Sequence, residues 1–199
     1  MKIVVATSNA GKLKEIARLL ADQPVELINL ADLDSVPEIV EDGDTFAANA
    51  EKKALTVARA TGQPTLADDS GLTVAALGGA PGVHSARYAG ENADDAANNR
   101  RLLQELEGVP ESERSAAFVC DLAFVLPDGR CWHFTGKMAG RILNEGRGTG
   151  GFGYDPLFYL EEHGCTLAEM PLDRKNAISH RGQALRRFRE ALPKLLRTL

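Results

Sequence analysis

Apolar residues recur along this chain with two different periods, and these periods predict where strands and helices lie. Mostly apolar runs at residues 2–7 and 25–30 predict two short strands. Apolar positions at helical spacing predict helices at about residues 13–20, 45–61 and 92–106. The first half of the chain therefore alternates between strands and amphipathic helices.

The second half of the chain is richer in strands. Residues 115–126 and 130–142 predict two long strands, and Pro127-Asp128-Gly129 between them is a hairpin turn signal. Residues 157–160 predict a shorter strand. After Gly182 a helix is predicted, which we expect Pro193 to kink or split. Its apolar stripe comprises Leu185, Phe188, Leu192, Leu195 and Leu196.

Two adjacent carboxylates, Asp68 and Asp69, separate the predicted strands at residues 63–67 and 72–77. Neighbouring residues of a strand point to opposite faces, so both acids can serve one site only if the backbone turns. We expect Ser70-Gly71 to supply that turn. A carboxylate at such a strand end suits Mg²⁺, which prefers oxygen ligands. The alternative is an Asx turn that only closes a hairpin.

The segment Thr7-Ser8-Asn9-Ala10-Gly11-Lys12 lies between the first predicted strand and the first predicted helix. Free N–H groups and the helix dipole make such a loop an anion-binding arrangement, and Lys12 adds a positive charge. The segment is not a P-loop, because Ala6 and Leu13 occupy positions that this motif reserves for other residues. The alternative is an ordinary first βα turn.

The predicted helix at 45–61 carries a lysine on its apolar face. Asp44 or Thr45 is expected to cap it, and the acidic residues 31–44 before it, including Asp34, are expected to be irregular and solvated. The inward face comprises Phe46, Asn49, Ala50, Lys53, Val57 and Ala60. A buried ammonium needs an anion. Lys53 is therefore expected to meet either a phosphate or a carboxylate of the protein, Glu41 or Asp69.

Residues 145–156 form a glycine-dense segment in which Gly148, Gly150 and Gly153 spell G-x-G-x-x-G. We reject a dinucleotide-binding interpretation, because a strand-like run and not a helix follows. The aromatic ring of Phe152 or Tyr154 could stack on a flat ligand and Asp155 could bond its edge; the alternative is a wide surface loop. Further along, Ser179-His180-Arg181 is expected just before the last helix.

Composition narrows the functional classes. The chain has 199 residues, 44% of them hydrophobic, with a net charge of −5. This size suits one well-packed domain or two lobes around a cleft, and the acidic balance argues against binding of long nucleic acid. No run is long enough to span a bilayer and the N-terminus does not resemble a signal peptide. Three cysteines and four scattered histidines show no metal-ligand spacing, and the odd cysteine count indicates thiols in a reducing compartment.

Taken together, the motifs resemble those of the inosine/xanthosine triphosphate pyrophosphatases, the Ham1-like house-cleaning nucleotidases. The resemblance runs nearly end to end, and only the ordered set of motifs makes it specific. The motifs are Thr7 to Lys12, Glu41 before Gly43-Asp44-Thr45-Phe46, Asn49-Ala50 with Lys53-Ala54, Ala67 to Leu72, Gly79-Ala80-Pro81-Gly82, Ser85-Ala86-Arg87-Tyr88, Gly150 to Pro156 and Ser179 to Gly182.

The resemblance implies an elongated, two-lobed α/β fold with a long central mixed β-sheet flanked by helices and the active site in the cleft between the lobes. It implies one domain over residues 1–199, a homodimer and a cytoplasmic location. The implied activity is Mg²⁺-dependent hydrolysis of ITP, dITP and XTP to the monophosphate and pyrophosphate. This activity would keep deaminated purines out of DNA and RNA.

By resemblance, Asp69 is the general base and a metal ligand, and Glu41 is the second metal carboxylate. The implied substrate-binding residues are Thr7, Ser8, Asn9, Ala10, Gly11, Lys12 and Lys53 at the triphosphate, and Ser70, Phe152, Gly153, Tyr154, Asp155, Lys175, His180 and Arg181 at the nucleoside. Asp68 could share the role of base. Donors from Arg181, Lys175 or the backbone would satisfy a 6-oxo purine and mismatch adenine.

Two other classes stay open from the sequence. One is a Maf-type nucleotide pyrophosphatase with a different base preference, which the Ser179-His180-Arg181 and glycine-rich motifs disfavour. The other is a nucleotide-binding regulator without catalysis, which the presence of Glu41 and Asp69 with the lysines disfavours.

Overall fold

The computed structural model describes residues 1–33, 35 and 38–197 and contains a mixed seven-stranded sheet. The strand order is β2-β1-β3-β4-β5-β6-β7; β1 is parallel to β2 and β3, and β6 is antiparallel to β5 and β7. The strands are β1 Lys2–Val5, β2 Glu26–Asn29, β3 Thr65–Val74, β4 Ser115–Val125, β5 Cys131–Ile142, β6 Phe158–Leu160 and β7 Cys165–Thr166. The α-helices are α1 Ala10–Leu20, α2 Phe46–Thr61, α3 Asp95–Glu105, α4 Leu172–Ile178 and α5 His180–Leu195. This is the α/β class that the resemblance implies. Asp34, one of the acidic residues expected to be solvated, lies outside the described residues.

The described chain divides into two compact units. Unit 1 comprises residues 1–69, 120–136 and 181–199, and unit 2 comprises residues 70–119 and 137–180. Each unit has its own hydrophobic core.

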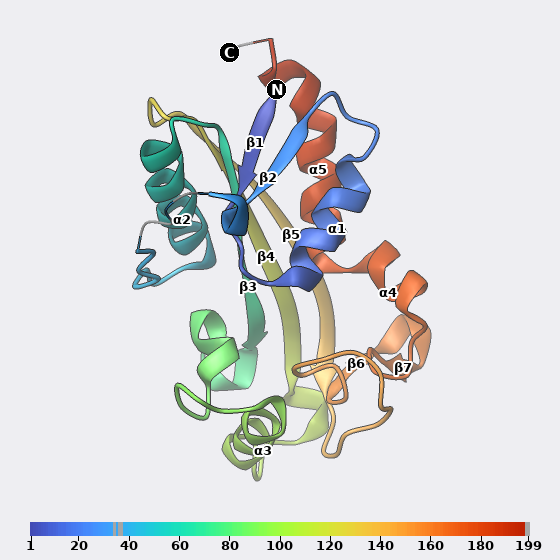
Figure 1. The fold of residues 1–199 in the computed structure, drawn as a ribbon. Coiled ribbons are helices and arrows are strands. Elements are labelled where there is room, and N and C mark those ends of the chain that lie inside the picture. The colour runs from blue at the N-terminus through green and yellow to red at the C-terminus, as the bar shows by residue number, and fades with distance from the viewer. Residues whose placement is uncertain (34, 36–37, 198–199) are drawn as a thin grey trace. The chain divides into compact units, whose positions relative to one another are not determined.

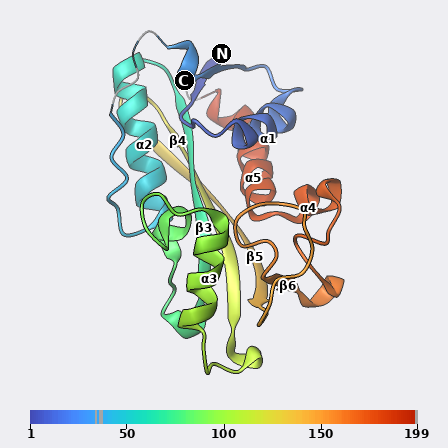
Figure 2. The same ribbon diagram turned by 60° about the horizontal axis from the view of Figure 1, so that its bottom comes forward.

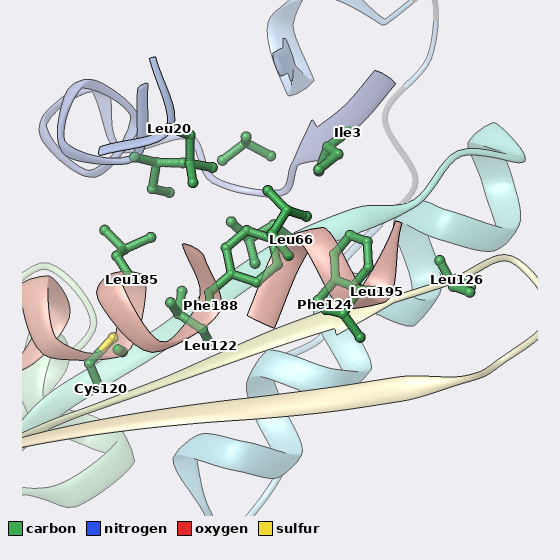
Figure 3. Close-up of a cluster of buried hydrophobic side chains, with 14 residues drawn as sticks. Ile3, Leu20, Leu66, Cys120, Leu122, Phe124, Leu126, Leu185, Phe188 and Leu195 are labelled. Atoms are coloured by element: carbon green, nitrogen blue, oxygen red, sulfur yellow. The ribbon is translucent and has the colours of Figure 1, made fainter. Parts of the chain in front are cut away.

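Unit 1 has helices on both sides of its strands, with α1 and α5 on one side of β1 and α2 on the other (Figures 1 and 2). The alternation of side chains along β1 produces this layering. Ile3 and Val5 join a cluster with α1 and α5, whereas Val4 and Ala6 join a cluster with α2. Figure 3 shows the first cluster, in which Phe188 of α5 lies among residues of the strands.

Helix α5 confirms four residues of the predicted apolar stripe, because Leu185, Phe188, Leu192 and Leu195 are buried. The fifth, Leu196, lies just after the helix and is partly buried against the same cluster. Pro193 does not split the helix, which continues to Leu195 with the proline in its last turn, and a kink there stays a prediction. The predicted start was also late. Residues His180 and Arg181, expected before the helix, lie in its first turn.

Helix α2 confirms most of the predicted inward face, and Thr45 is its N-cap, with its side chain accepting a hydrogen bond from the Ala48 N–H. Ala60 is the exception, because it is exposed; Ala54 and Ala58 are buried. The burial of Lys53 and Asn49 on this face is confirmed.

The turn expected at Ser70-Gly71 is wrong, because β3 runs without interruption through both residues. Gly71 serves a different purpose. A Cβ atom there would lie 2.3 Å from Oγ of Ser85 and 2.7 Å from the carbonyl oxygen of Gly82. The glycine therefore permits a close approach between two segments of unit 2. After Val74 the chain enters a short 3₁₀ helix, where the prediction had continued the strand to residue 77.

Unit 2 is built around a second cluster that joins residues of β3, α3, β4, β5 and the segment after residue 153, including Leu72, Leu102, Ile142 and Phe158. Its α4 was not predicted from the sequence. That helix is only seven residues long, and only Lys175 in it is buried.

Candidate active site

Asp68 and Asp69 lie on opposite faces of β3 in unit 1, as the alternation of an uninterrupted strand requires. Leu66, two residues before Asp68, belongs to the cluster with α1 and α5. Ala67, two residues before Asp69, belongs to the cluster with α2. The two acids therefore meet different neighbours.

Asp68 is buried between cations of α1 and α5. Its Oδ2 lies 2.8 Å from Nζ of Lys12 and 3.3 Å from Nε of Arg181, and Arg181 also bonds Glu15 at 2.9 Å. Burial alone would raise the pKa of Asp68, but the charges of Lys12 and Arg181 outweigh it and lower the pKa to about 2. Asp68 is therefore ionised at neutral pH and is a weak base, and its Oδ1 has no hydrogen-bond partner within the described residues.

Asp69 is buried on the α2 side, where Nδ2 of Asn49 donates a hydrogen bond to its Oδ2 at 3.1 Å. Burial raises the pKa of Asp69. Lys53 and the Asn49 hydrogen bond oppose this effect and the charge of Glu41 adds to it, so that the pKa lies above its ordinary value. Of the two acids, Asp69 is thus the better proton acceptor.

Lys53 forms an ion pair with a carboxylate of the protein. Its Nζ lies 2.8 Å from Oε1 of Glu41, and its side chain is 10% exposed against 38% for Glu41. This is one of the two alternatives that the sequence left open. The neighbouring Lys52 points away from this group and pairs with Asp42.

The loop before α1 is largely exposed but its amides are not all free. Oδ1 of Asn9 accepts hydrogen bonds from the N–H groups of Gly11 at 2.9 Å and Lys12 at 3.1 Å, and the Asn9 N–H bonds Oγ1 of Thr7 at 3.2 Å. The expectation of free amides is wrong for these groups. Ser8 and Ala10 are exposed beside them. Because the Asn9 side chain caps the helix, the loop is already ordered by its own hydrogen bonds.

In unit 2 the glycine-rich segment holds an exposed aromatic ring. Phe152 is 64% exposed, and Nζ of Lys175 lies 4.6 Å from the centre of its ring. Oδ2 of Asp155 accepts from the Phe152 N–H at 2.8 Å and pairs with Lys175. In this arrangement Asp155 organises the loop and Phe152 presents the surface on which a flat ligand could stack.

Two of the other predicted residues of unit 2 anchor this segment, and two lie elsewhere in the unit. The Tyr154 hydroxyl donates to the carbonyl of Ser85 at 2.8 Å, and the Gly153 N–H donates to Asp95 at 2.6 Å. The His180 ring stacks on Phe118 with a centroid distance of 5.1 Å. Ser70 is half-buried in β3.

Sequence reasoning missed three features of this region. Asn49 was predicted on the inward face but not as the hydrogen-bond partner of Asp69. Nothing in the sequence indicated that Glu15 forms an ion pair with Arg181. The third is a group of Glu51, Cys131 and His133, whose potential ligand atoms lie within 4.8 Å of one another. The spacing Cys-x-His on a predicted strand places both side chains on one face and could have indicated it.

Comparisons with known proteins identify the family of the chain. The Ham1 family model matches residues 3–191. A protein of Geobacter sulfurreducens named "dITP/XTP pyrophosphatase" is 56% identical over 191 residues, which is 96% of each chain. One of Desulforamulus reducens with the same name is 52% identical and covers 98% of this chain and 97% of its own.

Solved structures show the same fold. A HAM1 protein from Coxiella burnetii superposes with a TM-score of 0.93 at 46% identity and covers 98% of this chain and 99% of its own. The Staphylococcus aureus Ham1 protein gives a TM-score of 0.91 at 37% identity, with 98% and 100% covered. This chain belongs to the Ham1 family.

Proposed function

We propose that this protein hydrolyses dITP, XTP and ITP to the monophosphate and pyrophosphate. The observation that carries the proposal is the division of labour between adjacent acids. Asp69, beside Lys53 and Glu41, has a raised pKa. Asp68 is ionised and its charge is balanced by Lys12 and Arg181. The names of relatives that are about half identical over nearly the whole chain supply the substrate class.

Asp69 takes the role of general base in this proposal. Hydrolysis at the α-phosphorus requires removal of a proton from water, and in the metal-free protein Asp69 is the better proton acceptor of the two acids. The Asn49 hydrogen bond at 3.1 Å fixes the orientation of the carboxylate. Asp68 stays ionised and positions Lys12, whose ammonium group is one of the two that would bind phosphate oxygens; Lys53 is the other.

The donor set at Asp69 and Glu41 fits Mg²⁺. Both are carboxylates, and Glu41 contributes to the pKa of Asp69, so that the two negative charges act on each other. When bound, Mg²⁺ would supply neutralisation of the charge that develops on the phosphate oxygens. Glu41 can exchange its ion pair with Lys53 for the metal, which would free the ammonium for the substrate.

The nucleoside is assigned to unit 2 in this proposal. The exposed ring of Phe152 offers a stacking surface, and Lys175 and the loop backbone offer donors to a 6-oxo purine.

Within the described residues, no helix has the length and the apolar character that a membrane span requires. A cytoplasmic homodimer completes the proposal, as expected for the family.

A substrate panel tests the function. ITP, dITP, XTP, ATP, GTP and dTTP are incubated with Mg²⁺, and pyrophosphate and orthophosphate are measured separately. We expect rapid release of pyrophosphate from ITP, dITP and XTP, and slow turnover of the others. Initial release of orthophosphate would overturn the proposal, preference for dTTP would favour the Maf type, and binding without turnover would indicate a regulator.

A further inference from the structure

A second group of chemically competent side chains lies on unit 1, on residues that the proposed catalysis does not use. Cys131 and His133 are two residues apart on β5 and therefore point to the same side of the strand. Cys131 packs against the cluster that includes α2, so this is the side that α2 covers. Glu51, on α2, reaches the same place.

The three side chains are already in contact. Nε2 of His133 lies 3.3 Å from Sγ of Cys131 and 3.1 Å from Oε2 of Glu51. The side chains of His133 and Glu51 are 32% and 48% exposed, so an ion could approach from solvent. Without a metal these contacts are a thiol–imidazole hydrogen bond and a histidine–carboxylate pair, and both are centred on Nε2 of His133.

We propose that Glu51, Cys131 and His133 bind one divalent transition-metal ion of the Zn²⁺ class, with a fourth position open to water. One sulfur, one nitrogen and one oxygen donor suit Zn²⁺, whereas Mg²⁺ disfavours thiolate. The site is distinct from the carboxylates at Asp69 and does not depend on the proposed hydrolysis.

The separations of the donor atoms are close to those a metal requires. Zn–S, Zn–N and Zn–O bonds of ordinary length at tetrahedral angles place donor atoms roughly 3.4–3.6 Å apart. Two of the separations are 3.3 and 3.1 Å, and all three lie within 4.8 Å. The third separation, between Cys131 and Glu51, can change by rotation of the half-exposed Glu51 side chain.

Metal binding at this site must compete with a proton. Burial and the charge of Glu51 raise the pKa of the Cys131 thiol to about 11, so the metal-free thiol is protonated at neutral pH. A bound transition metal deprotonates a thiol ligand. Affinity should therefore increase with pH, with one proton released for each ion bound.

Cobalt absorption tests the site directly, because a sulfur-to-cobalt charge-transfer band appears only when a thiolate binds Co²⁺. The metal-free, reduced protein is titrated with Co²⁺ in excess Mg²⁺, which occupies carboxylate sites. We expect the band to saturate at one equivalent of Co²⁺ and to disappear when Zn²⁺ is added.

Variants assign the ligands. Cys131→Ser should abolish the band, and His133→Gln and Glu51→Gln should each weaken Co²⁺ binding at least about 10-fold. Cys165→Ser, which removes a partly buried thiol from unit 2, should leave the titration unchanged. Thermal unfolding of each variant confirms that it is folded.

Three results would overturn the proposal. The first is no charge-transfer band in the unaltered protein, and the second is a band that survives Cys131→Ser. The third is a band that requires Cys131 but is insensitive to both His133→Gln and Glu51→Gln, which would identify a lone thiol instead of a three-ligand site.

Discussion

At the scale of single residues, two adjacent aspartates with the same chemistry have opposite electrostatic environments. Asp68 contacts two cations and has a lowered pKa, whereas Asp69 shares its surroundings with another carboxylate and has a raised one. The difference arises because β3 points them to opposite sides.

We expect Asp69→Asn to lower the rate of ITP hydrolysis by about 10²- to 10⁴-fold, as for loss of a general base. The fold should be kept, because asparagine retains an oxygen that can accept the Asn49 hydrogen bond. Steady-state rates and thermal midpoints measure both effects. Asp42→Asn, in the exposed pair with Lys52, is the control and should change neither. A large loss of midpoint in Asp69→Asn would identify a structural role.

The lowered pKa of Asp68 predicts a specific pH dependence of stability. An acid whose pKa is lowered by folding stabilises the protein above its unfolded pKa, and this contribution is lost as pH falls through the folded value. A drop from 3.8 to about 2 corresponds to a contribution on the order of 2 kcal/mol.

The free energies of unfolding of the metal-free protein and of Asp68→Asn should therefore differ by a constant amount above about pH 4. The difference should shrink as pH falls toward 2. Denaturant titrations at several pH values measure it. A difference that does not change with pH would mean that the carboxylate charge contributes nothing.

Lys53 and Lys52 form a matched pair on α2, one 10% and one 44% exposed. We expect Lys53→Met to reduce turnover by roughly 10²-fold or more, as for loss of a charge on a phosphoryl group. Stability should fall only slightly, because Glu41 is partly exposed and can be hydrated. Lys52→Met should alter neither quantity. Retained activity with a much lower midpoint would make Lys53 a structural ion-pair partner only.

The sequence could predict which residues of the site are chemically capable but not which of them are already paired. Helical spacing placed Lys53 and Asn49 inward, and both are buried. Nothing in the spacing indicated that Glu15 bonds Arg181 across 166 positions of sequence, because side-chain pairs between distant segments depend on the packing of the whole unit.

At the scale of elements, periodicity and the Pro127-Asp128-Gly129 turn signal were reliable, but the turn expected at Ser70-Gly71 was not. Four of the five residues predicted for the α5 stripe are buried in that helix, and Thr45, one of the two predicted caps, is the N-cap of α2. Asp-Asp-Ser-Gly was interpreted as a turn because these residue types favour turns, but pairing within the sheet overrides that preference and the strand continues. The glycine is explained by a neighbour distant in sequence, which no local pattern reveals.

This interpretation of Gly71 predicts that Gly71→Ala destabilises unit 2 by about 1–3 kcal/mol, as for overpacking. The added Cβ would meet Ser85 Oγ at 2.3 Å. Adding Ser85→Ala should not recover the loss, because Ser85 Cβ at 2.9 Å and the Gly82 carbonyl at 2.7 Å still obstruct. The Leu72 N–H would also lose its hydrogen bond to Ser85 Oγ at 2.9 Å. Gly146→Ala is the milder comparison and should cost less, because its nearest contact, Cβ of Pro156, is 3.3 Å away. Denaturant unfolding of the four proteins measures this, and an unaltered Gly71→Ala midpoint would contradict it.

At the scale of the whole molecule, unit 1 is assembled from three separate segments of chain. Its first cluster joins Ile3 of β1 to Phe188 of α5, so the final segment completes a core that the first begins (Figure 3). The division of the chain into units could not be predicted from composition, because no linker marks it.

We expect a chain shortened to residues 1–180 to lose the cooperative unfolding of unit 1, because five buried hydrophobic residues of α5 would be absent from its core. A chain shortened to residues 1–196 keeps all of α5 and is the control. Circular dichroism during heating and limited proteolysis distinguish the two. A normal transition in the shorter chain would show that α5 is dispensable.

The order of segments also has a consequence during synthesis on the ribosome. Unit 2 is complete when residue 180 has been made, whereas unit 1 still lacks residues 181–199. At ordinary translation speeds those 19 residues take about one to four seconds. During that interval the apolar faces of β1 and α1 have no C-terminal helix to cover them. Until α5 has been made, these apolar faces of the nascent chain are therefore open to aggregation and to chaperones.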